Sequence, residues 1–113
     1  GFIFGAAMAQ ALGAGFVPLR KSGKLPPPVV GVDYGLEYGM DRLEIGSQAL
    51  APGERVIVVD DVLATGGTLE AGRRLVERLG AEVIGASVVI ELGGLNGRSK
   101  WPLPLPLHAL MAY

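Results

Sequence analysis

Residues 55–70 constrain the fold more than any other part of the chain, and they read RVIVVDDVLATGGTLE. The four apolar residues 56–59 do not alternate with polar ones, which predicts a strand buried on both faces in a parallel sheet. Residues 65–68, with their two central glycines, predict a tight turn, and a helix is expected from about Gly67 or Thr68. The sequence therefore predicts an α/β unit of strand, short loop and helix.

The start of this helix is a predicted anion site, because a helix N-terminus presents unpaired N–H donors and a partial positive charge. Asp60 and Asp61 stand just before it and cannot bind an anion themselves, but they suit hydroxyl groups or a hydrated metal ion. The combination fits a ligand with a phosphate at one end and a diol nearby, such as a ribose 5-phosphate. The alternative is an ordinary strand–turn–helix in which the carboxylates only cap the helix and the glycines only form the turn. A Walker-type phosphate loop is excluded because no Lys follows the glycines.

Residues 56–68, VIVVDDVLATGGT, resemble the motif that binds phosphoribosyl diphosphate (PRPP) in type I phosphoribosyltransferases, and the wording is most similar to that of adenine phosphoribosyltransferases. The resemblance implies that Asp60 and Asp61 bind the ribose hydroxyls, that Asp61 is also catalytic, and that Val62 packs on the base. It also implies that the 5-phosphate is held by a loop consisting of Ala64, Thr65, Gly66, Gly67 and Thr68.

A basic cluster follows the apolar residues 16–19, which we expect to begin a strand. Three positive charges at the end of a strand are a candidate anion clamp, since ligands of open α/β sheets lie outside the carboxyl ends of the strands. A solvated basic loop would show the same pattern. The segment also resembles the R-K-x-G-K-L-P segment of adenine phosphoribosyltransferases, which implies that Lys21, Lys24 and Arg20 approach the diphosphate of PRPP.

Residues 30–38 alternate between apolar and polar side chains, which predicts a strand with one apolar face. We expect a turn at residues 39–41 and a return strand over residues 42–45, together forming a hairpin lid. Its Y-x-L-E-Y-G wording resembles the flexible catalytic loop of adenine phosphoribosyltransferases. This implies that Glu37 exchanges a proton with the base and that Tyr38 closes over the site. The alternative is that Glu37 is an exposed strand residue and Tyr38 an apolar anchor.

Composition and helix-ending glycines predict the remaining elements. Residues 6–12 are alanine-rich and predict a helix closed by Gly13 or Gly15. Gly80 is expected to stop the helix that follows the loop, and residues 82–92 and 107–113 are expected to be strands. Arg98 and Lys100, in a loop that also matches the family, are expected to be solvated charges.

Composition excludes several classes of function. The 113 residues allow one domain, and a net charge of −1 gives no electrostatic footprint for nucleic acid. There are no cysteines and only one histidine, His108, so neither a disulfide framework nor a histidine metal cluster is possible. No apolar run approaches the roughly 18 residues of a spanning helix. We therefore expect a cytoplasmic protein that binds neither nucleic acid nor membrane.

The resemblance runs along the whole chain but covers only about the later two thirds of the family's length. Gly1 and Phe2 look like the Gly-Phe pair that follows an Arg loop in family members. We therefore expect the N-terminal hood and one core strand of the family to be missing. The expected fold is α/β, a type I phosphoribosyltransferase fold in which a central, mainly parallel sheet is flanked by helices and carries a flexible hairpin lid.

The function that the resemblance implies is conversion of adenine and PRPP to AMP and diphosphate, with Mg²⁺ carried by PRPP rather than by direct protein ligands. It also implies a homodimer. Three alternatives stay open: a PRPP- or nucleotide-binding protein without turnover, an inactive fragment, and a phosphoribosyltransferase for another purine such as xanthine.

Overall fold

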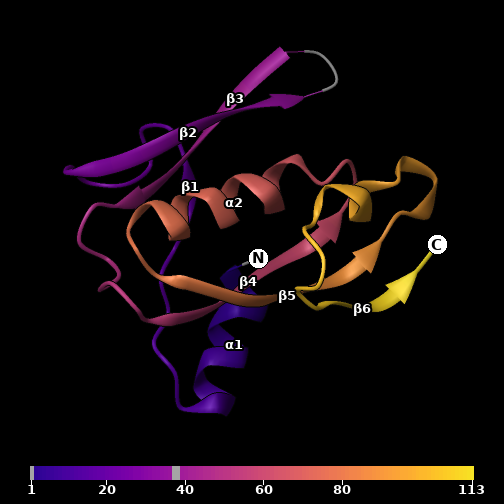
Figure 1. The fold of residues 1–113 in the computed structure, drawn as a ribbon, viewed down its shortest axis with the longest axis horizontal. Helices are drawn as coiled ribbons and strands as arrows, with labels where there is room; N and C mark the ends of the chain where they lie inside the picture. Colours follow the sequence, from indigo (N-terminus) through magenta and orange to yellow (C-terminus); the bar gives the residue numbers. More distant parts are fainter. Residues whose placement is uncertain (1, 37–38) are drawn as a thin grey trace.

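Helix α2 lies between two three-stranded sheets in the computed structural model, which describes residues 2–36 and 39–113 (Figure 1). One sheet has the strand order β1-β3-β2 and the other has the order β4-β5-β6. The elements are α1 (Phe2–Leu12), β1 (Arg20–Lys21), β2 (Val29–Leu36), β3 (Gly39–Gly46), β4 (Arg55–Leu63), α2 (Gly67–Arg78), β5 (Glu82–Glu91), the short 3₁₀ helices η1 (Gly93–Leu95) and η2 (Gly97–Lys100), and β6 (Leu107–Ala112).

The β4-β5-β6 sheet is parallel throughout, which confirms the predicted α/β class. The β4-α2-β5 segment is a crossover unit, and such units place their helix on one face of the sheet. Apolar side chains of α2 such as Leu69 and Val76 pack there against Val58 and Val88. The helix ends as predicted, with Gly80 in the left-handed region at φ 85°.

The opposite side of α2 carries the antiparallel β1-β3-β2 sheet. Leu75 and Ala71 of α2 form a second buried cluster there with Val32, Tyr34 and Ile45. The alternation predicted over residues 30–38 is confirmed from Val32 to Gly35, since Val32 and Tyr34 are buried whereas Asp33 and Gly35 are exposed. Gly31, which was expected on the polar face, is buried. One helix therefore joins both sheets, and it begins where β4 ends.

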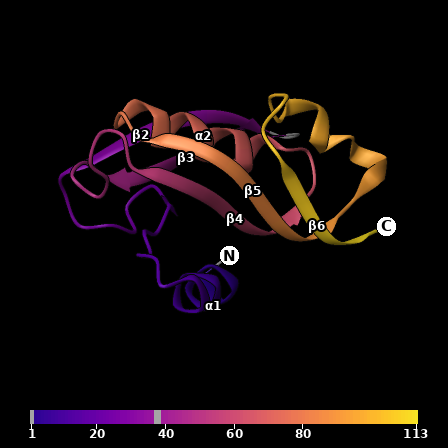
Figure 2. The same cartoon turned by 60° about the horizontal axis from the view of Figure 1, so that its bottom comes forward.

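Helix α1 lies across the β4-β5-β6 sheet from α2, as Figure 2 shows. It starts at Phe2, four residues before the predicted start, and Gly13 follows it at φ 66° as expected. A Cβ at Gly5 would lie 3.1 Å from the Phe16 ring, so the helix approaches the following segment closely. None of its residues is buried.

Three predictions about strands are wrong. Residues 16–19 form no strand, because Pro18 lacks an N–H for a ladder and Leu19 instead packs toward Gly72 of α2. Residues 39–41 are not a turn but lie in β3, since β2 and β3 pair as far as Leu36 and Gly39. Strand β4 is not buried on both faces, since Ile57 is 41% exposed. Among the described residues, β4 is the edge strand of its sheet and pairs with β5 alone.

Candidate functional site

The 64–68 loop connects β4 to α2 and places the first donors of the helix at the end of the parallel sheet. Gly66 precedes α2 in the left-handed conformation, at φ 89° and ψ −3°, where a residue with a Cβ would be strained. It has no side chain that could cap the helix, and its carbonyl accepts the N–H of Glu70 at 3.1 Å. The N-terminal N–H groups of α2 are therefore presented at the loop, as an anion site requires.

A small cavity of about 60 Å³ lies against this loop. Its lining consists of Val62, Leu63, Ala64, Thr65, Gly66, Thr68 and Leu69. The structure thus brings together Val62 and every predicted loop residue except Gly67. Val62 is 40% exposed and so presents an apolar surface beside the loop. A cavity of this size suits a small group such as a phosphate rather than a whole nucleotide.

Asp60 and Asp61 lie in the last part of β4 and not in a separate turn, because the strand continues to Leu63. The N–H of Asp61 donates to Oδ1 of Asp60 at 2.9 Å, and the N–H of Val62 donates to Oδ1 of Asp61 at 3.0 Å. These bonds hold both carboxyl groups near the strand end. They lie within a few residues of the helix donors, as the sequence predicts.

The two carboxyl groups differ in their protonation. Partial burial, together with its hydrogen bond to Asp61, raises the pKa of Asp60 above the usual 3.8. The hydrogen bond with Asp60 lowers the pKa of the more exposed Asp61. The pair can therefore offer one strongly ionised carboxylate and one that holds its proton more readily. Such a pair suits hydroxyl groups and developing positive charge.

The basic residues lie on a different part of the fold from the one expected. They do not follow a strand of the parallel sheet, because β1 pairs antiparallel with β3 of the hairpin. Lys21 forms an ion pair with Asp41 at 2.9 Å, which raises the pKa of Lys21 and lowers that of Asp41. Arg20 stands over the Phe2 ring at 5.1 Å, and Lys24 is exposed. The basic segment is thus attached to the hairpin.

Glu44 is a residue that the sequence reasoning missed. It is buried in β3, with 7% exposure, and its carboxylate accepts the N–H of Gly23 and Nε of Arg42, both at 3.2 Å. A buried acid between Leu43 and Ile45 in a strand requires such partners, and this was the available signal. Glu44 fastens the basic segment to the hairpin.

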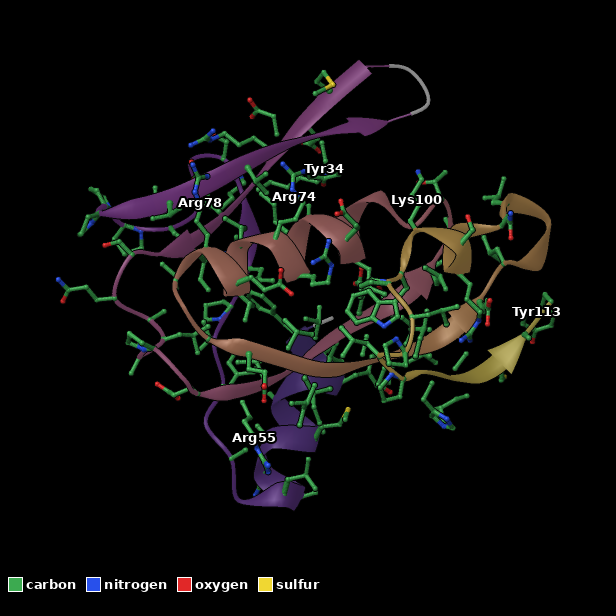
Figure 3. The ribbon with its side chains drawn as sticks, viewed as in Figure 1. Tyr34, Arg55, Arg74, Arg78, Lys100 and Tyr113 are labelled. Carbon is green, nitrogen blue, oxygen red and sulfur yellow. The ribbon has the colours of Figure 1, made fainter. Side chains whose placement is uncertain are left out.

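The hairpin reaches the 64–68 loop through β2. A Cβ at Gly67 would lie 3.2 Å from the Gly35 carbonyl oxygen and 3.5 Å from Cδ2 of Tyr34, which lies between β2 and α2 (Figure 3). Glu37 and Tyr38 lie outside the described residues, so their predicted roles stay predictions.

The segment after β5 contains one further departure from expectation. Arg98 is not simply solvated: its guanidinium donates to both oxygens of Glu91, at 2.7 and 2.9 Å, and to the Leu107 carbonyl at 2.7 Å. It therefore fastens this segment to β5 and β6. Lys100 is exposed, as predicted.

A larger cavity of about 430 Å³ extends along β4, between α1 and residues 14–19. Asp60 and Thr68 border one end of it, but most of the lining is apolar. An apolar cavity does not stabilise a phosphate, so we assign the anion site to the smaller cavity at the 64–68 loop.

Two further observations limit the chemistry. Within residues 2–36 and 39–113, no cluster of three or more His, Cys, Asp or Glu side chains could hold a metal ion. No helix in the same part of the chain is long and apolar enough to cross a membrane. A divalent ion at this site would therefore depend on oxygens supplied by a ligand, with at most the Asp60–Asp61 pair contributing.

Comparison with known proteins agrees with this geometry. Residues 1–104 match the phosphoribosyl transferase domain. A curated adenine phosphoribosyltransferase from Synechococcus sp. (strain JA-3-3Ab) is 57% identical over 111 residues, which cover 98% of this chain and 63% of that relative.

Solved structures give the same result. The adenine phosphoribosyltransferase of Rhodothermus marinus matches with a TM-score of 0.96 and 51% identity, covering 99% of this chain and 64% of that one. The Saccharomyces cerevisiae enzyme, crystallised with an imino-altritol bisphosphate and adenine, matches with a TM-score of 0.90 and 48% identity over 96% of this chain and 61% of that one. The chain spans a little less than two thirds of the length of these relatives.

Proposed function

Because this chain belongs to the phosphoribosyl transferase domain family and has its type I fold, we propose that it carries the PRPP site of an adenine phosphoribosyltransferase. The proposed reaction joins adenine to the ribose 5-phosphate of PRPP, giving AMP and diphosphate in purine salvage. The names of the relatives support adenine as the base. The observation that carries the proposal is the Asp60–Asp61 pair near the end of β4, one short loop before the left-handed Gly66 that precedes α2.

Each end of PRPP has a complementary group in this arrangement. The 5-phosphate would lie at the 64–68 loop, accepting hydrogen bonds from the first N–H groups of α2 and from the hydroxyls of Thr65 and Thr68. Asp60 and Asp61 would accept hydrogen bonds from the ribose hydroxyls, and Val62 would pack on the base. This fixes the ribose at both ends, which orients the anomeric carbon for attack.

The bond changes follow from this placement. The bond from the anomeric carbon to the diphosphate oxygen breaks as a bond from N9 of adenine forms, so positive charge develops on the ribose. The ionised Asp61 carboxylate would stabilise that charge. Glu37 is proposed to take the proton that adenine loses.

The basic segment would stabilise the departing diphosphate. Lys21 is protonated at neutral pH, and its ion pair with Asp41 raises its pKa further. The diphosphate would compete with Asp41 for this charge. Lys24 and Arg20 would contribute further positive charge. Mg²⁺, bound through the oxygens of PRPP with no more than the carboxylate pair from the protein, would neutralise diphosphate charge.

The first test is PRPP-dependent conversion of adenine to AMP by this chain, with calorimetric titration of PRPP in parallel. We expect Asp61→Asn to lower kcat/KM by about 100-fold and Lys21→Ala to lower it by about tenfold or more. Asp33→Asn and Lys100→Ala, which change exposed groups outside the site, serve as matched controls and should stay near the parent value.

The outcomes separate the possible functions. Near-normal turnover in both site variants would contradict the site assignment. Binding of PRPP without turnover would favour a PRPP-binding protein, the alternative that the partial coverage of the relatives keeps open. A folded chain that binds no PRPP would overturn the proposal. Conversion of xanthine in preference to adenine would change the base but not the phosphate site.

We further propose that the chain acts in the cytoplasm as a homodimer. Helix α1 supports self-association, since it has no charged residue and no buried one, and Ile3 and Leu12 are 81% and 65% exposed. Apolar surface of this kind is characteristic of contacts between subunits.

A further inference from the structure

The 64–68 loop touches the segment after β5 through a contact between two glycine backbones. Gly97 begins η2, after Asn96 in the left-handed conformation at φ 53°, and it is buried. A Cβ at Gly97 would overlap the Ala64 carbonyl oxygen and lie 2.9 Å from the N of Gly66. Conversely, a Cβ at Gly66 would overlap the Gly97 carbonyl oxygen. Neither position has room for a side chain.

The loop is confined from its other side as well. Gly67 lies against β2, where a Cβ would be 3.2 Å from the Gly35 carbonyl oxygen. The backbone of the 64–68 loop therefore lies between Gly97 on one side and Gly35 on the other. Its conformation depends on both neighbours and not on its own residues alone.

Several hydrogen bonds hold the segment that contains Gly97. Next to it, Arg98 is fixed by the two bonds to Glu91 and the one to Leu107 described above. The N–H of Trp101 donates to the Arg98 carbonyl at 3.1 Å, and the buried Trp101 indole donates to Leu105 at 3.1 Å. A segment fixed in this way can act as a support for the loop that it touches.

We propose that Gly97 is a positioning residue for the 64–68 loop, setting the spacing of the backbone N–H groups that receive the 5-phosphate. This inference rests on the proposed function. Hydrogen bonds from backbone N–H to phosphate oxygen require distances close to 2.9 Å and nearly linear geometry, so a shift of about 1 Å in the loop removes them. Gly97 itself need not touch the ligand.

The test compares Gly97→Ala with Gly94→Ala, a matched control in the same segment whose Cβ would meet nothing within 4 Å. We expect calorimetry to show PRPP binding at least about tenfold weaker in Gly97→Ala and unchanged in Gly94→Ala. If turnover is measurable, the KM for PRPP should rise while the KM for adenine stays constant. PRPP affinity within about twofold of the parent in a folded Gly97→Ala chain would overturn the proposal.

A readout without ligand separates this inference from the proposed function. In ¹⁵N-labelled chains, Gly97→Ala should shift the amide resonances of residues 65–68, and Gly94→Ala should leave them in place. If the parent does not bind PRPP but these amides move, the proposed function fails and the support by Gly97 stands. Unmoved amides would contradict the support itself.

A second variant covers the case in which Gly97→Ala does not fold. Arg98→Gln removes the bonds to Glu91 without adding volume at the contact, and because the Arg98 side chain is 46% exposed the chain should stay folded. We expect it to weaken PRPP binding several-fold and to shift the same amides. Parent-like affinity and parent-like amide resonances in Arg98→Gln would count against the proposal.

Discussion

Asp60 and Asp61 show how two identical side chains acquire different chemistry from their positions. Burial raises the pKa of Asp60. The hydrogen bond between the two side chains lowers the pKa of Asp61. An ionised Asp60 therefore costs folding free energy at neutral pH, while ionised Asp61 is favoured. We interpret this cost as a property of the binding site, because ribose hydroxyls would add hydrogen bonds to the half-buried carboxylate when the ligand binds.

The consequence is a stability prediction for Asp60→Asn. A carboxyl group whose pKa is higher in the folded chain than in the unfolded one stabilises the fold below the unfolded value, and this contribution is lost as pH rises through the folded value. Asp60→Asn should therefore be more stable than the parent at pH 7, and the difference should shrink as the pH falls toward 3.8, the usual pKa of the group. Urea unfolding across this pH range measures it.

Leu103→Gln, which changes a side chain that is 93% exposed and does not titrate, provides the control, and the difference between its midpoint and that of the parent should be the same at every pH. A parent chain more stable than Asp60→Asn at pH 7 would show that the carboxylate is stabilised in the fold and not penalised.

Single residues also show what local sequence cannot reveal. The carboxylate pair and the glycines of the loop were predictable because consecutive residues carry the motif. No role was assigned to Glu44 or Gly97, because their partners lie far away in the sequence. Glu44 accepts a hydrogen bond from Gly23. Gly97 contacts Ala64 and Gly66. An acid between two apolar residues, or a glycine in a loop, has no distinctive local pattern.

At the scale of elements, α2 is fastened at both ends. Its start lies against Gly35 of β2, and at its other end Arg78 points toward the same strand, donating from Nη1 to the Gly31 carbonyl at 2.9 Å (Figure 3). Helix and hairpin are thereby joined along the length of β2. This arrangement keeps the hairpin next to the 64–68 loop.

Because Arg78 is exposed, we expect Arg78→Gln to destabilise the chain by about 1 kcal/mol, the typical net contribution of one hydrogen bond. Arg74→Gln on the same helix is the matched control. Arg74 pairs only at 3.9 Å with Glu70 and is 46% exposed, so its loss should cost at most about 0.5 kcal/mol. Urea midpoints compare the two, and equal midpoints would mean that the bond to Gly31 contributes nothing.

Helices and strands were predicted correctly where the apolar pattern of the sequence is strong. They were predicted wrongly where pairing with a distant strand determines the structure. Helix α2 and the strands β5 and β6 were predicted close to their observed limits. Residues 16–19 are apolar enough for a strand but pair with no strand in the part of the chain that the structure describes. Residues 39–41 look like a turn yet pair with β2. The sequence also did not predict which sheet the basic segment joins, since no residue near Lys21 indicates that β3 is its neighbour.

The whole molecule exposes an apolar helix, α1, on the far side of the parallel sheet (Figure 2). If a second copy covers it, Ile3→Lys should weaken self-association at least about tenfold, because each partner would have to bury a charge. Light scattering over a concentration series measures the change. Leu103→Lys, at a site 93% exposed and distant in sequence, should leave association unaltered.

A parent chain that is monomeric at all concentrations would contradict the proposed homodimer. An Ile3→Lys chain that associates as the parent does would place the contact elsewhere than on α1.

The link between Arg78 and Gly31 also has a consequence for the order in which the chain folds. It joins residues 47 positions apart, whereas β4, the 64–68 loop, α2 and β5 follow one another within residues 55–91. Contacts between residues close in sequence require less loop closure and form sooner. The β4-α2-β5 unit should therefore fold first and the hairpin should dock onto it later, so that the 64–68 loop reaches its final conformation only when Gly35 comes to lie against it.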